Sequence, residues 1–265
     1  MNIETFFKFV SMSIQKQLTY RFDYFVGILN AFLYVFIFTS VWSSLYANAG
    51  GAVYQGFSIT GIITYAVFAM VIRVSFSMDD TAVPSKVRDG SVAIDLIRPI
   101  SFFYMQLAQS LGHSIFHIFA RSLPVLFVSM LFFDVTIPLT ANLFLFPLMA
   151  ILGYLILFMV NYVIGLLAFW FIEIFPFLLF KYGLITLFSG GIVPVDFFPD
   201  FVKPALSLLP FQYILYTPTV ALTGHVTGTP LYNLLMGQII WVFLLALLSK
   251  VMWNLGRGKL MIQGG

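Results

Sequence analysis

The side chains best suited to chemistry lie on one predicted membrane helix. His113 and His117 are four residues apart, so both project from the same face of that helix. Two histidines at this spacing bind zinc in HExxH proteases, but Ser114 stands where the catalytic Glu would be. The chain also has no Cys, which excludes disulfides, zinc–thiolate sites, iron–sulfur clusters and a cysteine nucleophile. We therefore expect no catalytic residue and no metal site.

The two histidines belong to a longer polar stripe along the first half of this helix, made up of Gln106, Ser110, His113, His117 and Arg121. Polar residues within a membrane span usually face the interior of the bundle or water. One interpretation is the wall of a transport pathway or a proton relay. The other is a half-helix near the cytoplasmic interface that hydrogen-bonds its neighbours. The second is favoured, and the lack of neighbouring carboxylates in the sequence weakens a relay further.

Nucleotide and nucleic-acid binding motifs are missing as well. The sequence has no GxxxxGK[ST] loop, and the tail Gly256-Arg257-Gly258-Lys259 lacks that spacing and the following Ser or Thr. No GxSxG nucleophile motif occurs. The net charge of +3 is carried by only 13 Lys and Arg, too few for a nucleic-acid groove. We expect no cofactor on this chain and no nucleic-acid partner.

The composition identifies the class of protein. The chain has 265 residues, of which 61% are hydrophobic and 9% charged, with a mean hydropathy of +1.00. Soluble proteins are about 45–50% apolar and about 25% charged. Because the apolar residues form long continuous runs, the sequence predicts an all-α integral membrane protein that crosses the membrane several times.

Six runs are long or apolar enough to be predicted as transmembrane helices, since about 20 residues cross the hydrocarbon core. They cover approximately residues 25–46, 57–76, 102–133, 143–171, 175–188 and 231–253. Lys and Arg gather before the first run, between the second and third, early in the fifth, and after the sixth. Cytoplasmic loops carry this excess, so we expect both termini to be cytoplasmic. Residues 1–22 have apolar side chains at helical spacing, which predicts an interfacial amphipathic helix.

Residues 192–229 form an unusual connection between the fifth and sixth runs. The segment is apolar, yet prolines such as Pro194, Pro199 and Pro210 interrupt it, and Gly190 and Gly191 precede it. Dense proline breaks continuous helices. Broken backbone at membrane depth survives only where protein or a cavity shields it. The pattern predicts short re-entrant or interfacial helices on the outer face.

Residues 77–100 form the one long polar stretch, with the sequence SMDDTAVPSKVRDGSVAIDLIRPI. Four acids and three bases surround a turn at Asp89-Gly90, and apolar residues follow it. Such a compact amphipathic element suits docking into a groove of a soluble partner, with apolar anchors and charges that set the register. The simpler interpretation is a cytoplasmic loop folded onto the membrane surface.

Three stretches together resemble the permease subunits of ABC-2 type exporters, and more narrowly the bacterial permeases encoded as pairs. Residues 88–100 resemble that family's "R-x-G … L-x-[RK]-P" segment. Residues 189–199 resemble its "SG … P … FP" stretch, and residues 209–218 its "LPF-x-Y … P" continuation. With six spans and the N-terminal helix, the resemblance covers the whole chain, 1–265, as a single transmembrane domain.

The resemblance implies a division of labour between subunits. Two ATPase subunits would hold ATP and Mg, and a second permease, identical or homologous, would complete the pathway for a hydrophobic or amphipathic substrate. The protein would lie among the lipids of the bacterial inner membrane. The segment 77–100 would contact the ATPase, through Lys86, Arg88, Asp89, Gly90, Leu96, Arg98 and Pro99.

A channel or ion-coupled carrier that works without an ATPase is the alternative from another class. Such a protein needs carboxylates within the membrane or a clear inverted repeat. The predicted spans contain essentially no Asp or Glu, and no repeat is apparent. The residues therefore favour the exporter permease.

Overall fold

The computed structural model describes residues 3–18, 22–48, 53, 55–98, 100–136 and 141–259. This part of the chain is helical and contains no β-strand. The longer helices are α1 (Ile3–Gln17), α2 (Phe22–Asn48), α3 (Ile59–Ser75), α6 (Phe102–His117), α7 (Leu123–Phe132), α8 (Phe146–Leu166), α9 (Phe175–Phe188) and α12 (Thr229–Arg257). The short ones are α4 (Ala82–Arg88), α5 (Val92–Leu96), α10 (Lys203–Ser207) and α11 (Tyr216–Thr223).

Local sequence explains where several helices begin. Ser58 precedes α3, and its side-chain oxygen accepts a hydrogen bond from the Gly61 amide at 3.1 Å, which satisfies a donor that the helix itself leaves open. Five helices, α7, α8, α9, α10 and α12, carry Pro in their first two positions. Proline is tolerated there because its missing N–H would have no partner within the helix.

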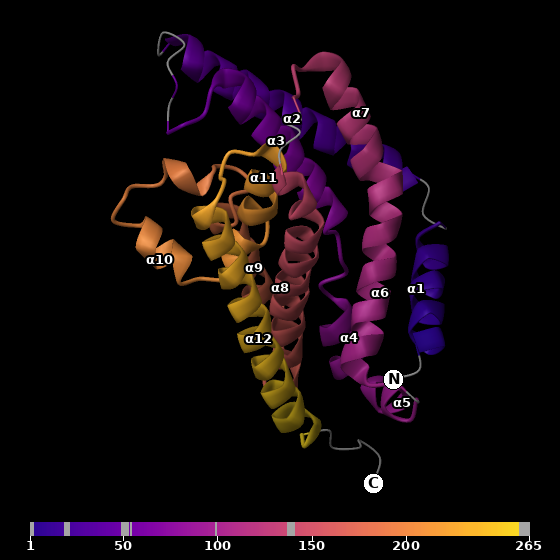
Figure 1. Cartoon of the computed structure of the whole chain (residues 1–265). Helices are drawn as coiled ribbons and strands as arrows, with labels where there is room; N and C mark the ends of the chain where they lie inside the picture. The colour runs from indigo at the N-terminus through magenta and orange to yellow at the C-terminus, as the bar shows by residue number, and fades with distance from the viewer. Residues whose placement is uncertain are drawn as a thin grey trace.

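The long helices form an elongated bundle (Figure 1). α8 and α12 lie side by side, α1 runs along α6, and α2 crosses over α3. α5, the first turn of α1 and the last turn of α12 lie at one end of the bundle, whereas the last turns of α2 and α7 lie at the other. The main apolar core lies where α6, α8 and α12 meet residues 211–215.

The helices follow the predicted spans closely. Four helical stretches of the described chain are long and apolar enough to cross a membrane: Phe25–Ala47, Phe102–Phe132, Asn142–Phe169 and Thr229–Arg257. The predicted second and fifth spans are the shorter helices α3, with 17 residues, and α9, with 14. At about 1.5 Å per residue, α9 extends about 21 Å, less than the roughly 30 Å of a hydrocarbon core. The total of six spans stays a prediction.

The third span contains a turn of π-helix, Ile118–Ser122 (η1), between α6 and α7. A π-turn inserts one extra residue, so the residues after it are rotated about the helix axis. α6 packs against α1 before this turn, and α7 packs against α2 and α3 after it. One long helix thereby contacts two different sets of neighbours.

The N-terminal helix α1 packs against α6 at very short distance. Ser13 Oγ donates a hydrogen bond to the Gln109 carbonyl oxygen at 2.6 Å, and Val10 is buried. A Cβ atom at Gly112 would lie 2.4 Å from the Val10 carbonyl oxygen. Backbone atoms cannot yield as a flexible side chain can, so this contact requires glycine. Of the predicted segment 1–22, residues 1, 2 and 19–21 lie outside the described residues.

We predict that Gly112→Ala destabilises the protein by about 1–3 kcal/mol, because α1 must move away from α6 to admit the methyl group. Gly183→Ala on α9 is the matched control, since a Cβ there meets nothing within 4 Å. The control should be neutral or slightly stabilising, because Ala favours helix. Thermal unfolding in detergent compares them, and equal melting temperatures for the two variants would contradict the close contact.

Candidate functional site

Residues 77–100 fold into two short helices joined by a tight turn. α4 ends at Arg88 and α5 begins at Val92, and Gly90 between them has φ +75°, a conformation that favours glycine. Asp89 Oδ1 accepts a hydrogen bond from the Ser91 amide at 2.9 Å. Hydrogen bonds from Ser91 lower the pKa of the Asp89 carboxyl, so it is ionised at neutral pH and fixes the start of α5.

A buried carboxylate holds the two helices together. Asp95, with 5% of its side chain exposed, lies between two cations. Lys86 Nζ is 2.7 Å from Asp95 Oδ2, and Arg98 Nη1 is 3.5 Å from Asp95 Oδ1. Sequence analysis identified Lys86 and Arg98 but missed Asp95, the residue that brings them together. The local sequence carries no signal for its burial, because its apolar neighbours Ile94 and Leu96 are themselves exposed.

The tip of this segment exposes an apolar surface. Ile94, Leu96 and Ile97 are 59%, 47% and 84% exposed, whereas Val92 is fully buried. Arg88 and Asp89 are exposed beside them. Pro99, the remaining residue of the predicted contact set, lies outside the described residues. We refer to Ile94, Leu96 and Ile97 as the α5 tip.

Several contacts attach this segment to the bundle. A Cβ atom at Gly165 of α8 would lie 2.8 Å from Val83 Cβ, so α4 lies directly on α8. The Lys86 ammonium is 5.9 Å from the centre of the Phe102 ring, on α6. The Arg98 guanidinium lies 5.8 Å from the centre of the Phe9 ring, on α1. Three of the longer helices therefore contact the segment 77–100.

A second buried ion pair connects the start of the same segment to α9. Lys181 Nζ is 2.8 Å from Asp80 Oδ2 and donates to Asn161 Oδ1 at 2.8 Å. The Tyr182 hydroxyl also donates a hydrogen bond to Asp80. The Lys181 side chain is 1% exposed and that of Asp80 11%. In the sequence, Lys181 stands out only as the basic residue early in the fifth run, because its partner Asp80 lies a hundred residues away.

The predicted polar stripe is only partly one site. The Ser110 and Tyr154 hydroxyls are 2.6 Å apart, and His113 Nδ1 is 3.1 Å from the Ser77 carbonyl oxygen. His117 Nε2 is 3.3 Å from His113 Nε2. Arg121 lies further along, in the π-turn, where its guanidinium packs against Gly27 of α2.

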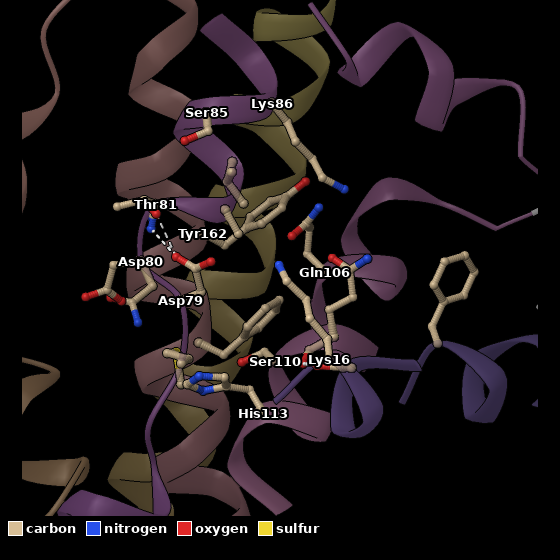
Figure 2. Close-up of a pocket in the computed structure, with 18 of the residues that line it drawn as sticks. Lys16, Asp79, Asp80, Thr81, Ser85, Lys86, Gln106, Ser110, His113 and Tyr162 are labelled. Atoms are coloured by element: carbon tan, nitrogen blue, oxygen red, sulfur yellow. Dashed lines mark hydrogen bonds between the residues drawn. The ribbon is translucent and has the colours of Figure 1, made fainter. Parts of the chain in front are cut away.

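Gln106, Ser110 and His113 line a pocket of about 530 Å³ between α1, α4, α6 and α8, and His117 and Arg121 are not among its lining residues. Figure 2 shows Lys16 and Asp79 on opposite sides of this pocket. Asp79 and Asp80 both line it. Carboxylates therefore do lie near the predicted polar stripe, although none was expected from the sequence. They were not apparent because they come from the stretch after α3 and not from the histidine helix.

The proline-rich connection is folded into the protein, in α10, α11 and two short 3₁₀ turns. Residues 211–222 are all buried. Gln238 Nε2, on α12, donates to the carbonyl oxygens of Met149 and Tyr213, both at 2.9 Å. A side chain from another helix thus satisfies a carbonyl of broken backbone, which is the shielding that such backbone requires at membrane depth.

The predicted breaks lie where the chain changes direction. Gly190 has φ +79°, and a Cβ atom there would lie 2.5 Å from Tyr216 Cβ. Its carbonyl oxygen accepts a hydrogen bond from the Tyr65 hydroxyl at 2.7 Å. Gly191 packs against Leu215. The prolines each stand just before a helical turn: Pro194 before Val195–Phe197 (η4), Pro199 ahead of α10, and Pro210 before Phe211–Tyr213 (η5).

A half-buried histidine, His225, belongs to this connection. The His225 ring stacks on Phe57, with ring centres 3.6 Å apart, and its Nε2 is 3.7 Å from Asp196 Oδ2. The Tyr216 hydroxyl donates to the same carboxylate oxygen at 2.9 Å. Burial lowers the pKa of His225, and the nearby Asp196 offsets this effect only in part.

The arrangement of the described residues is that of a membrane protein with a charged element at one end. Long apolar helices form a membrane domain, and a compact charged element with an apolar tip projects at one end. The family described as ABC-2 family transporter protein matches residues 18–264. A comparison with curated proteins gives no match.

The chain belongs to the ABC-2 transporter family, since the match covers nearly its whole length. It is an ABC transporter permease, a membrane component that is not itself catalytic. Membership of the family implies partnership with an ABC ATPase.

We predict that Lys181→Met destabilises the protein by about 3–5 kcal/mol, because it leaves the Asp80 carboxylate buried without its cation. Adding Asp80→Asn should restore part of the loss. Lys203→Met is the control, since its pair with the 96% exposed Asp200 is worth about 1 kcal/mol or less. Thermal unfolding in detergent measures all three, and a Lys181 variant as stable as the Lys203 variant would refute the assignment.

We predict that His225 makes stability depend on pH. Because its pKa is lowered in the folded state, folding favours the neutral ring. That contribution is complete above the unfolded pKa of about 6.5 and is lost as the pH falls through the folded value. The melting temperature should therefore fall between pH 7.5 and 5.5, and fall less in His225→Gln. Parallel pH profiles for the two proteins would contradict this prediction.

Proposed function

We propose that this chain is the permease subunit of an ATP-driven exporter in the bacterial inner membrane, and that residues 77–100 are its contact with the ATPase. The observation that carries the proposal is the α5 tip. Three aliphatic side chains are exposed on an element that two ion pairs, Lys86–Asp95 and Arg98–Asp95, hold rigid. Exposed apolar anchors surrounded by charge are typical of protein interfaces.

The orientation agrees with this role. The first turn of α1, the α5 tip and the last turn of α12 lie at the same end of the bundle. Lys86, Arg88, Arg98, Arg257 and Lys259 belong to the segments at this end. A basic excess marks the cytoplasmic side, so we place both termini and the ATPase there. Six crossings then follow, with α3 and α9 as the second and fifth, and residues 192–229 on the outer side.

The contacts of the segment suggest how movement would be transmitted. Two ATPase subunits that close on ATP would push α4 and α5 of each permease. α4 lies on α8, Arg98 contacts α1, and Asp80 is paired with Lys181 of α9. Displacement of the segment would therefore move these helices together as rigid bodies, against a second permease that is identical or homologous. The pathway between the two would carry a hydrophobic or amphipathic substrate.

Pull-down of the tagged permease from nanodiscs, followed by mass spectrometry, tests the partnership. We expect a stoichiometric ATPase with the parent chain. Ile97→Asp should reduce its recovery at least tenfold, because a charge replaces an apolar anchor of the kind that dominates interfaces. Phe201→Asp is the matched control, since Phe201 is also 84% exposed but lies in the outer connection.

Substitutions in the turn test coupling separately from assembly. Gly90→Ala with Arg98→Ala should abolish transport while insertion into the membrane is unchanged. Normal transport by the double variant would refute the coupling role. A chain that purifies alone and conducts ions in liposomes without ATP would instead support the channel or ion-coupled carrier.

A further inference from the structure

The pocket between α1, α4, α6 and α8 has both polar and apolar walls. Its volume of about 530 Å³ is within the range of small-molecule sites. Its apolar side includes Phe9 and Met12 from α1, Met78, and Phe158 from α8. Met12 is 62% exposed, so the apolar wall continues onto the outer surface of the protein. A ligand with a polar end and an apolar end would fit this geometry.

Two buried polar groups in this pocket have no hydrogen-bond partner. Gln106 Nε2 and the Tyr162 hydroxyl belong to side chains that line it, and the two residues are only 3% and 2% exposed. Figure 2 shows both side chains projecting into the pocket from different helices. Buried polar groups nearly always have a partner, and an unpartnered one costs about 1–3 kcal/mol. Two such groups, on side chains that line one cavity, could be satisfied by a ligand bound there.

The charged groups around the pocket specify what the ligand must offer. Lys86 and Arg98 are paired with Asp95, and Asp80 is paired with Lys181. Asp79 Oδ1 already accepts hydrogen bonds from the Thr81 amide and hydroxyl, at 3.0 and 2.7 Å. Of the charged groups in the described pocket wall, Lys16 of α1 and Asp79 have no ion pair, and Thr81 already donates to the Asp79 carboxylate. Lys16 is therefore the cation left to attract a ligand.

The three available groups are therefore an amide N–H, a phenol O–H and an ammonium, and all three donate hydrogen bonds. A matching ligand group has several acceptor oxygens and a negative charge. Phosphate and carboxylate have this chemistry, and hydrogen bonds to such charged groups are the stronger ones.

We propose that this pocket binds the anionic headgroup of an amphipathic molecule. Gln106, Tyr162 and Lys16 donate to the headgroup oxygens, and the apolar chain leaves along Phe9 and Met12. Such a molecule is either a membrane lipid or the exported substrate. Only the second role rests on the proposed function, whereas binding itself requires no ATPase.

Binding to the purified permease alone tests the proposal independently of any partner. The probe is short-chain phosphatidylglycerol, titrated in neutral detergent and followed by its effect on the melting temperature. The variants are Tyr162→Phe, Gln106→Leu and Lys16→Met. The matched controls are Tyr232→Phe, a hydroxyl removed from an exposed residue of α12, and Lys8→Met on the exposed part of α1.

We expect each pocket variant to bind the lipid about tenfold more weakly, as for loss of one hydrogen bond to a charged group. Tyr162→Phe and Gln106→Leu should also melt no lower than the parent without lipid, because each removes an unpartnered buried atom. A residue with a purely structural role would instead lower that melting temperature. Equal lipid affinity in pocket variants and controls would overturn the proposal.

Two further measurements show whether the ligand is free phosphate, a resident lipid or the exported substrate. Inorganic phosphate should bind at least a hundredfold more weakly than the lipid, and equal affinity would overturn the amphipathic part of the proposal. In liposomes that contain the reconstituted transporter, ATP-dependent loss of the lipid from one leaflet supports the substrate role. Binding without such movement supports a resident lipid. Absence of a partner ATPase would refute the proposed function and leave the binding result intact.

Discussion

The buried pair between Asp80 and Lys181 is the constraint on which the half of the bundle that contains α4 and α5 depends. An uncompensated charge in an apolar interior is too costly to persist, so Asp80 and Lys181 must stay together. The 2.8 Å contact joins α9 to the segment that follows α3. Asp95 likewise joins α4 and α5, through its ion pairs with Lys86 and Arg98. Together the two carboxylates fix this polar segment internally and attach it to the bundle.

Much of the fold could be predicted from the sequence, because long apolar runs leave few alternatives to helices. The predicted runs 102–133 and 231–253 correspond closely to α6–α7 and α12. The proline-rich connection was also predicted as a series of short helices, and it contains α10 and α11. What the sequence could not provide was pairing between distant helices. The requirement for glycine at Gly112 arises only from its contact with α1.

The candidate site was predicted less completely, because it too depends on contacts between residues that are far apart in the sequence. The turn at Gly90 and the charges around it could be recognised because they lie within a few residues of one another. Asp95 was overlooked because spacing along a helix does not reveal which charge is buried. The pocket combines residues from α1, α6 and α8, so neither Tyr162 nor Lys16 had a signal in the sequence. Spacing placed His117 with Gln106, but the pocket does not include it.

The π-turn at Ile118–Ser122 has an electrical consequence. An energised membrane holds a voltage, and a file of polar side chains across its full thickness would conduct protons through the bilayer. Apart from Ser129, the polar residues of this long helix end in the π-turn. Beyond it, α7 has the sequence LPVLFVSMLF, in which the one hydroxyl, that of Ser129, is buried. Beyond the π-turn this helix therefore offers no continuous polar path away from the polar pocket.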